Sequence, residues 1–322
     1  MASLTQEQLK QFRREGYLLV EGLLDPAEDL DPVYHEYARV LNDLAKLLYD
    51  KGEISSTYDN LPFSQRLIEM IKESGKVHAQ YFDFTLHGAS VTDETAFWVG
   101  PEVFHLLRNE RLLDAVESLI GPEIYSNPVQ HIRLKPPEQF TPKDTEGRLQ
   151  LGKTPPHQDN GVITPDADQT EMLTVWFPLW DATVENGCLM MWPNSKEEGL
   201  LDHCPAYDGL QIPAKMIHGE PKSMPMKRGD VLFMHRLTMH ASHANLSNHV
   251  RWSFDLRYNP IGQPTGRGAF PGFVARSRQS PETELHDPAE WARLWHETRY
   301  RLARTLEAPA FNRWSADSPV CA

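Results

Sequence analysis

The sequence predicts a mainly β protein with helical additions, in which a sandwich or jelly-roll core is wrapped by helices. Between about residues 123 and 260, short β-branched and aromatic runs are separated by Pro, Gly and Asn, with no helical pattern between them. These runs are Val129–Lys135, Met172–Leu179, Cys188–Trp192, Asp230–Met234 and Val250–Tyr258. Helical periodicity occurs before and after this region. We therefore expect a single domain, with a mostly helical part at 1–122, the β core at 123–260, and a loop and C-terminal helix at 261–322.

Four helices and one short strand are expected before the core. The first helix begins at a capping box formed by Thr5 and Gln8 and ends at Gly16, and Tyr17–Val20 follows as a strand. A second helix is indicated by apolar residues spaced three and four apart: Tyr34, Tyr37, Ala38, Leu41, Leu44 and Leu48, with Gly52 at its end. Two more helices are expected at Phe63–Ser74 and Glu110–Ile120. After the core, a last helix opens at Asp287 with Pro288 in its first position.

Composition excludes several classes of partner. The formal net charge of −13 argues against a surface that binds nucleic acid or anionic lipid. No apolar run approaches the roughly 20 residues that span a bilayer, and the N-terminus lacks the pattern of a secretory signal. The three cysteines, Cys188, Cys204 and Cys321, are odd in number and lack CxxC spacing. We expect them to be reduced thiols of a cytoplasmic protein, not disulfides.

The segment TPPHQDNGV suggests a metal site. His157 and Asp159 are two residues apart, so on an extended strand their side chains point to the same side. With a second histidine they would form a two-histidine, one-carboxylate set, which suits a non-haem Fe(II) that must also bind O2 and a co-substrate. An HxD tripeptide often occurs by chance. The support here is the order of features: HxD, a β-rich interval, a histidine, and an arginine eleven residues later on a strand.

His240 is the preferred third ligand among four late histidines. The turn-like stretch 245–248 follows it and leads into the strand that carries Arg251, which predicts a hairpin with both residues facing one cavity. His235 would point to the opposite face of an extended segment, whereas His243 remains the main competitor.

Arg251 is the candidate clamp for the co-substrate. In VRWSFDLRY, Trp252, Phe254, Leu256 and Tyr258 take one face of the strand, and Arg251, Ser253, Asp255 and Arg257 take the other. An arginine that faces into a barrel needs a carboxylate, and its planar fork binds one with two hydrogen bonds. The distal carboxylate of 2-oxoglutarate would serve. The alternative is a structural ion pair with an internal acid.

Together with the motifs that follow, these residues resemble those of the phytanoyl-CoA dioxygenase (PhyH) family. The HxD motif appears as His157-Gln158-Asp159, and Asn186-Gly187-Cys188-Leu189 is similar to the family's N-G-C-L. The family's H-G-S followed by N, S and R is matched by His240-Ala241-Ser242, Asn245, Ser247 and Arg251. The opening LTQEQLKQFRREGYLLVEGLL also fits, so the resemblance covers nearly the whole chain.

The resemblance implies a double-stranded β-helix core and Fe(II)- and 2-oxoglutarate-dependent dioxygenase activity. By it, Ser242 contacts 2-oxoglutarate and Trp176 lines the co-substrate pocket, with Gln130 and Lys135 as further candidates. Asp159 is intact, whereas related halogenases carry Ala or Gly there, so the resemblance implies hydroxylation. Two departures are Ala241 for the glycine after the distal histidine, and Asn194 and Lys196 within the family's P-G-S-H segment.

Two other function classes remain as alternatives. A metal-dependent jelly-roll hydrolase or isomerase would have no use for Arg251, and a catalytically silent binding module would be expected to have lost a ligand. The substrate is expected to be a small molecule. Tyr81, Phe82 and Phe84 could line its pocket, although an aromatic run is more often part of a core.

The segment 259–281 carries Arg267, Arg276 and Arg278 among prolines and glycines, without an acidic residue between them. One hypothesis is a loop over the cavity mouth whose arginines bind an anionic substrate. The alternative is that these arginines pair with acidic groups of the N-terminal helices.

Overall fold

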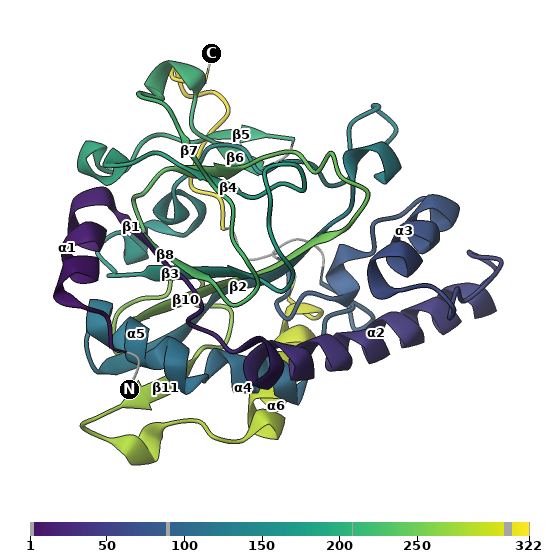
Figure 1. Ribbon diagram of the computed structural model, residues 1–322, viewed down its shortest axis with the longest axis horizontal. Helices are drawn as coiled ribbons and strands as arrows, with labels where there is room; N and C mark the ends of the chain where they lie inside the picture. Colours follow the sequence, from purple (N-terminus) through teal and green to yellow (C-terminus); the bar gives the residue numbers. More distant parts are fainter. Residues whose placement is uncertain (1–2, 88–90, 208, 306–310, 322) are drawn as a thin grey trace.

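The computed structural model describes residues 3–87, 91–207, 209–305 and 311–321. Its centre is a pair of antiparallel sheets that face each other, with most of the helices on the outer side of the larger sheet (Figure 1). This is the predicted jelly-roll core with helical additions. Within the described parts of the chain, no helix has the length and apolar character needed to cross a membrane.

The larger sheet has six strands in the order β1-β8-β3-β10-β2-β11, all paired antiparallel. Its strands are β1 (Tyr17–Val20), β2 (Glu123–Lys135), β3 (Leu173–Pro178), β8 (Val231–His235), β10 (Arg251–Pro260) and β11 (Phe273–Ser277). The two edge strands come from outside the expected core at 123–260. The chain ends therefore complete the sheet as well as wrapping it.

The smaller sheet has the order β7-β4-β9, and a separate hairpin lies beside it. Its strands are β4 (Leu189–Met191), β7 (Lys222–Met224) and β9 (His240–Ser242), and the hairpin consists of β5 (Cys204–Ala206) and β6 (Gly209–Gln211). An isolated bridge joins His157 to His240 and so extends this sheet by one residue.

β10 has the predicted two-sided character. Its apolar side chains are fully buried in the core beneath the helices: Trp252, Phe254, Leu256 and Tyr258. Tyr37 of α2 (Asp31–Asp50) meets the ring of Trp252 edge-on at 5.4 Å. The alternate side chains Arg251, Asp255 and Arg257 line a cavity on the other face. One strand thus separates the apolar core from a polar chamber.

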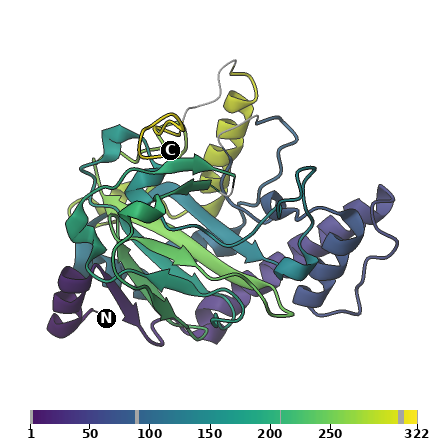
Figure 2. The ribbon, with the colours of Figure 1, turned by 90° about the horizontal axis from the view of Figure 1, so that it is seen from above.

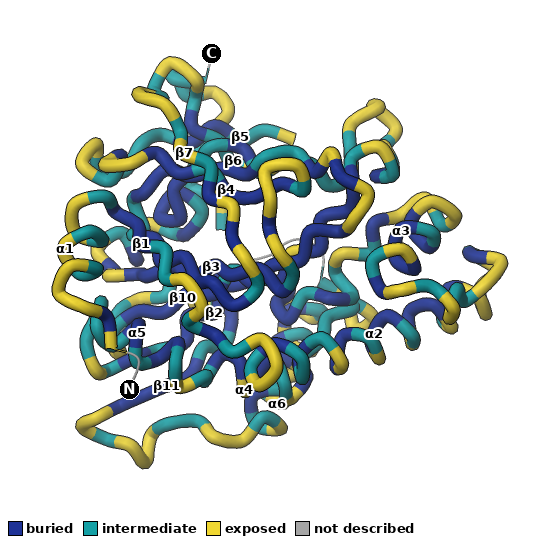
Figure 3. The backbone as a smooth tube through the Cα atoms, in the orientation of Figure 1, coloured by how far each residue is buried: buried dark blue, intermediate teal, exposed yellow. Residues whose placement is uncertain are grey.

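All the predicted helices are present, and the larger sheet packs against several of them. They are α1 (Gln6–Glu15), α2, α3 (Phe63–Ser74), α5 (Glu110–Ile120) and α6 (Pro288–Leu302). The capping box of Thr5 is formed, and Gly16 ends α1 in the left-handed conformation. A further helix, α4 (Pro101–Leu107), was not predicted because two turns are too short to show periodicity. Figure 2 shows α2 and α3 extending to one side of the sheets, and Figure 3 shows their outer surfaces exposed.

The predicted hairpin between His240 and Arg251 is wrong. β9 pairs with β4 in the smaller sheet, whereas β10 pairs with β2 and β3 in the larger one. The connection crosses between the sheets because Asn245 holds it to the end of β2. The Asn245 side chain donates to the carbonyl of Lys135 at 2.9 Å, and the backbone carbonyl of Asn245 accepts from the Glu138 backbone N–H at 2.9 Å. The two residues still face one cavity, from opposite sheets.

The expectation of reduced thiols is wrong for two of the three cysteines. Cys204 at the start of β5 forms a disulfide with Cys321, which fixes the C-terminal segment 311–321 to the β5–β6 hairpin. Cys188 is free and buried. A pairing across 117 residues leaves no local spacing signal, and the inference of a cytoplasmic protein loses the support that it took from reduced thiols.

The segment after β10 is partly a strand and not wholly a loop. Arg276 lies in β11 and forms ion pairs with Glu110, Asp114 and Glu117 of α5. Arg278 pairs with Glu117 as well, at 2.8 Å. These two arginines therefore fix β11 to an N-terminal helix, as the structural alternative proposed. Phe82 and Phe84 are likewise core residues.

We predict that Arg276→Ala destabilises the fold without changing the demand for co-substrate. Its side chain is 4% exposed, and removing it leaves several carboxylates without this cation. The free energy of unfolding should fall by about 1–3 kcal/mol, less than for a fully buried pair because the partners are partly exposed. Urea unfolding measures the loss. Arg278→Ala, 54% exposed, is the matched control and should lose less than about 1 kcal/mol; equal losses would contradict this account.

Candidate active site

The HxD segment is extended at its first two residues and then turns. The His157 backbone N–H donates to the His240 carbonyl and the His240 N–H donates back, both at 3.0 Å. Gln158 points the other way, where its side-chain amide donates to the carbonyls of Gly199 and Leu237 at 2.7 and 2.8 Å. Asp159 begins a short 3-10 turn. The alternation inferred from the sequence therefore brings His157 and Asp159 to one side.

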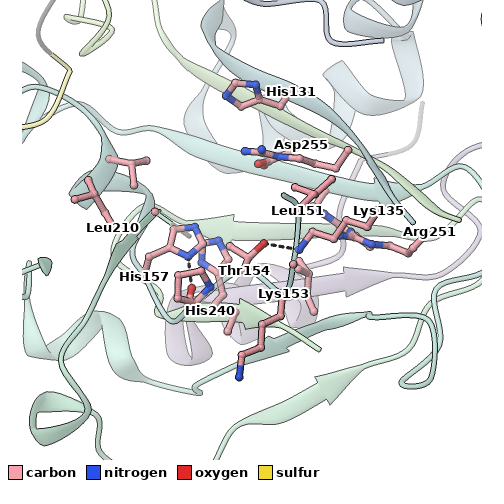
Figure 4. A pocket seen from close by; sticks show the side chains of 18 of the residues that line it. His131, Lys135, Leu151, Lys153, Thr154, His157, Leu210, His240, Arg251 and Asp255 are labelled. Carbon is pink, nitrogen blue, oxygen red and sulfur yellow. Dashed lines mark hydrogen bonds between the residues drawn. The ribbon is translucent and has the colours of Figure 1, made fainter. Parts of the chain in front are cut away.

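Three potential ligands converge at this point. One nitrogen or oxygen of each of His157, Asp159 and His240 lies within 4.8 Å of the others, and His240 Nε2 is 3.9 Å from Asp159 Oδ1. The two imidazole rings are 4.2 Å apart between centroids, and Figure 4 shows them side by side at one end of the cavity. Two imidazoles and one carboxylate in reach of one point are the donor set that non-haem iron(II) takes, with positions left open.

Both histidines are held in the tautomer that a metal needs. His157 Nδ1 lies 2.9 Å from the Pro155 carbonyl, and His240 Nδ1 lies 3.0 Å from the Thr238 carbonyl. A carbonyl only accepts, so each Nδ1 carries the hydrogen and each Nε2 keeps its lone pair. Burial, followed by the nearby His240, lowers the pKa of His157 to about 3. The ring is neutral and ready to coordinate.

Asp159 is fixed by two side chains from the larger sheet. Thr174 donates its hydroxyl hydrogen to Oδ2, and Arg257 donates to Oδ1. Burial alone would raise the pKa of this carboxyl, but the charge of Arg257 and the two imidazoles hold it below its ordinary value. Arg257 is itself anchored, because it also donates to the Val129 carbonyl at 2.8 Å. The carboxylate is thus ionised and oriented.

Strand alternation predicted that Arg257 faces the cavity, but no sequence feature assigned it a role. Its role could have been inferred because Arg257 lies on the same face of β10 as Arg251. A second arginine on that face needs an acidic partner, and the carboxylate of the HxD motif is nearby. Thr174 carried no such signal.

The competing histidines lie elsewhere. His243 hydrogen-bonds Ser223 Oγ through its Nε2 at 2.8 Å, and His235 accepts from the Leu237 backbone at 3.2 Å. Neither belongs to the ligand group found among the described residues. His240 lies at the start of β9, and its backbone pairs with that of His157 in the HxD segment.

Arg251 is a buried cation without an acidic partner. Only 2% of the residue is exposed, and no described Asp or Glu forms an ion pair with it. Its Nη1 donates to Ser253 Oγ at 2.8 Å, its Nε has no partner, and its guanidinium lies 5.6 Å from the ring centre of Trp176. Burial, followed by the charge of Arg133, lowers its pKa to about 10. A charge left in this state favours an anion that enters from outside.

Arg251, His157 and His240 line one cavity of about 440 Å3, large enough for two small molecules. Its floor is polar near Arg251, where Lys135 donates to Thr154 Oγ1 at 2.6 Å and to Ser242 Oγ at 2.8 Å (Figure 4). Trp176 lines the cavity. Ser242 is not a lining residue, but its hydroxyl accepts a hydrogen bond from Lys135, which is. Gln130 is buried but is not among the lining residues, so the structure does not bring it to this site.

The C-terminal segment 311–321 braces the metal-bearing turn from outside. Trp314 donates its indole N–H to the Gly161 carbonyl at 2.6 Å, and its ring stacks on His203 at 5.3 Å. His203 in turn accepts from the Gln158 backbone at 2.9 Å. A Cβ at Gly161 would come within 2.2 Å of the His203 ring, so the turn needs glycine there. No motif or spacing in the sequence predicted this contact.

Three comparisons place the chain among known proteins. It is 27% identical over 267 residues to phytanoyl-CoA dioxygenase domain-containing protein 1 of Danio rerio, covering 78% of this chain and 88% of that protein. It is 24% identical over 266 residues to the peroxisomal phytanoyl-CoA dioxygenase of Homo sapiens, covering 79% and 68%.

Among solved structures, the fold is similar to the non-heme monooxygenase ThoJ, with a TM-score of 0.57 and 16% identity over 92% of this chain and 98% of that one. It is also similar to the epimerase SnoN in complex with Fe3+, alpha ketoglutarate and nogalamycin RO. That comparison has a TM-score of 0.52 and 21% identity over 81% and 86% of the chains.

The sequence profile of the phytanoyl-CoA dioxygenase family matches residues 12–253. This range is well over half of the chain and includes the HxD pair, the distal histidine and Arg251. The chain therefore belongs to the phytanoyl-CoA dioxygenase (PhyH) family.

Proposed function

We propose that the protein is an Fe(II)- and 2-oxoglutarate-dependent dioxygenase that hydroxylates a carbon of a small anionic molecule and releases succinate and CO2. One observation carries the proposal: the cavity is lined by His157 and His240 of the ligand group that they form with Asp159, and also by Arg251, a buried arginine with no acidic partner among the described residues. A metal-dependent hydrolase would need the first group but would have no use for the second.

The three ligand residues would hold the iron, and Arg251 would bind the distal carboxylate of 2-oxoglutarate. Bound iron would supply the activation of O2 that is coupled to decarboxylation of the co-substrate. Thr174 and Arg257 keep the Asp159 carboxylate oriented, and the carbonyls of Pro155 and Thr238 keep both imidazole lone pairs directed at the ligand point. Trp176 forms an apolar wall beside Arg251, which excludes water from the anion and strengthens the contact.

The anionic character of the substrate is supported by Arg267. Unlike Arg276 and Arg278, it lines the cavity and forms no ion pair with a described acid. It donates to the Val162 carbonyl at 3.1 Å, and its guanidinium lies over the Phe311 ring at 4.2 Å. Its Nε is buried without a partner.

Burial, followed by Arg257 and Arg133, lowers the pKa of Arg267 to about 10. Arg251 and Arg267 are thus two unneutralised arginines in one chamber. We assign one to the co-substrate and the other to an acidic group of the substrate.

The first prediction separates the metal ligands from their neighbours. His240→Ala should lose stoichiometric Fe(II) and succinate formation, because it removes one of three donors. His243→Ala is the matched control and should keep both, since His243 contacts Ser223 outside the cavity. Metal analysis and succinate release measure the outcome. Retention of iron by the His240 variant and its loss from the His243 variant would overturn the assignment.

A second prediction concerns the clamp. Arg251→Lys keeps the positive charge but loses the bidentate contact with the carboxylate. The apparent Michaelis constant for 2-oxoglutarate should therefore rise roughly 10- to 100-fold. This corresponds to about 1.5–3 kcal/mol, the range for a hydrogen bond to a charged group. Arg278→Lys, exposed and paired with Glu117, is the control and should behave as the unaltered protein. An unchanged constant in the Arg251 variant would assign the clamp elsewhere.

A third prediction concerns the substrate charge. Small carboxylic acids, each compared with its methyl ester, should stimulate succinate release only as the free acids. For an acid that does so, Arg267→Met should raise the apparent substrate constant roughly 10-fold or more, because a charge-assisted contact is lost. Arg278→Met is the control. Equal stimulation by acid and ester would show that the substrate need not be anionic.

A further inference from the structure

A histidine outside the metal group also faces the cavity. His131 lies on β2, and Figure 4 shows it together with Asp255 on the side of the cavity away from His157 and His240. Its Nδ1 is 2.7 Å from Asp83 Oδ2 and 3.1 Å from Thr85 Oγ1. Asp83 belongs to the segment between α3 and α4, so a residue of the helical layer reaches the sheet to orient this ring.

The contact with Asp83 determines which nitrogen of His131 carries the hydrogen. A carboxylate only accepts, so Nδ1 is the donor and Nε2 keeps a lone pair while the ring is neutral. Burial lowers the pKa of His131 despite the opposing charge of Asp83, which favours the neutral ring. Nε2 forms no hydrogen bond with the described residues, and 21% of the side chain is exposed.

A second acceptor lies beside His131. Asp255 is its direct partner in the antiparallel pairing of β10 with β2, and it lines the same cavity. Its carboxylate contacts Arg257 at 3.4 Å, a long contact, because Arg257 is directed mainly to Asp159. An ionised carboxylate can only accept. The imidazole lone pair and the carboxylate thus place two acceptors side by side, although the donor Arg133 lines the same cavity two residues further along β2.

We propose that His131 and Asp255 form an acceptor site for a hydroxyl or amine N–H group of the substrate, with Asp83 as the positioning residue that keeps the His131 lone pair in place. The inference rests on the proposed function and deepens it. Together with Arg267, it describes a substrate that carries an acidic group and a hydrogen-bond donor, as a hydroxy acid or an amino acid does. A site built this way disfavours an analogue without the donor, because the substrate would separate these half-buried acceptors from water and leave them unpaired.

Asp83→Asn provides a sharp test because the structure fixes the orientation of the new amide. Asp83 Oδ1 accepts from the backbone N–H groups of Thr85 and Ile132, both at 3.4 Å. The amide oxygen of an asparagine would stay at these donors and its NH2 would face His131 Nδ1. The hydrogen of the ring should then move to Nε2, and the acceptor presented to the cavity becomes a donor.

The tautomer can be measured before any substrate is known. With the protein loaded with Zn(II) and 2-oxoglutarate and its histidines labelled with ¹⁵N, the signal absent from His131→Asn identifies the ring. We expect the hydrogen on Nδ1 in the unaltered protein and on Nε2 in Asp83→Asn. Asp93→Asn, whose parent residue pairs with Arg304 at the surface, should leave the signal unchanged. A hydrogen on Nε2 of the unaltered protein would overturn the proposal.

Turnover gives the second readout. Hydroxy acids compared with their O-methyl ethers should stimulate succinate release with a preference for the hydroxyl form of roughly tenfold or more, the loss expected from one unmade hydrogen bond in a closed site. Asp83→Asn should abolish or reverse this preference. Equal stimulation by hydroxyl and ether compounds would refute the acceptor site while leaving the dioxygenase assignment intact. Failure of the unaltered protein to bind iron and 2-oxoglutarate would instead refute the proposed function.

Discussion

The site depends above all on the buried ion pair between Asp159 and Arg257. The turn that carries Asp159 is bonded to the smaller sheet through the backbone pairing of His157 with His240, and to the larger sheet through this ion pair. The metal-binding turn is therefore held between the two sheets. Without Asp159, the buried Arg257 would keep only its longer contact with Asp255 at 3.4 Å, and the weaker pairing of a buried charge is destabilising. Removing the carboxylate would affect the fold as well as the metal, contrary to what a ligand at a strand end suggests.

The arginines that line the cavity differ in whether an acidic residue neutralises them. Among the arginines that line it, the buried Arg257 is neutralised by Asp159, whereas the buried Arg251 and the half-buried Arg267 have no acidic partner among the described residues. In a chain of net charge −13, acidic partners were available, and surface arginines such as Arg278 have them. An anion that enters completes a charge balance that the protein leaves open. Binding therefore relieves a cost already present in the folded state, which favours affinity and order together.

Much of this site could be predicted from the sequence because strand alternation is a local property. The two faces of β10, the HxD pair and the ends of most helices all follow from periods of two or 3.6 residues. Failures occur where the answer is not local. Gln130, a candidate from the family resemblance, does not line the cavity; it lies where β2 shifts register against β10, between His131 and Asn127. The hairpin expected at Arg251 fails because Asn245 directs the chain to the other sheet. The Cys204–Cys321 pairing and the contact of Trp314 join segments far apart in the chain.

The contact between segment 311–321 and the turn that carries Asp159 has a practical consequence. Residues 311–321 lie beyond the range shared with the family, and the disulfide at Cys321 fixes their end to β5. Thiol reductants are commonly added to keep iron ferrous, and here they would open the bond that holds this segment in place. Purification of this enzyme should therefore use ascorbate as the reductant, so that the backbone around Gly161 keeps its support from Trp314.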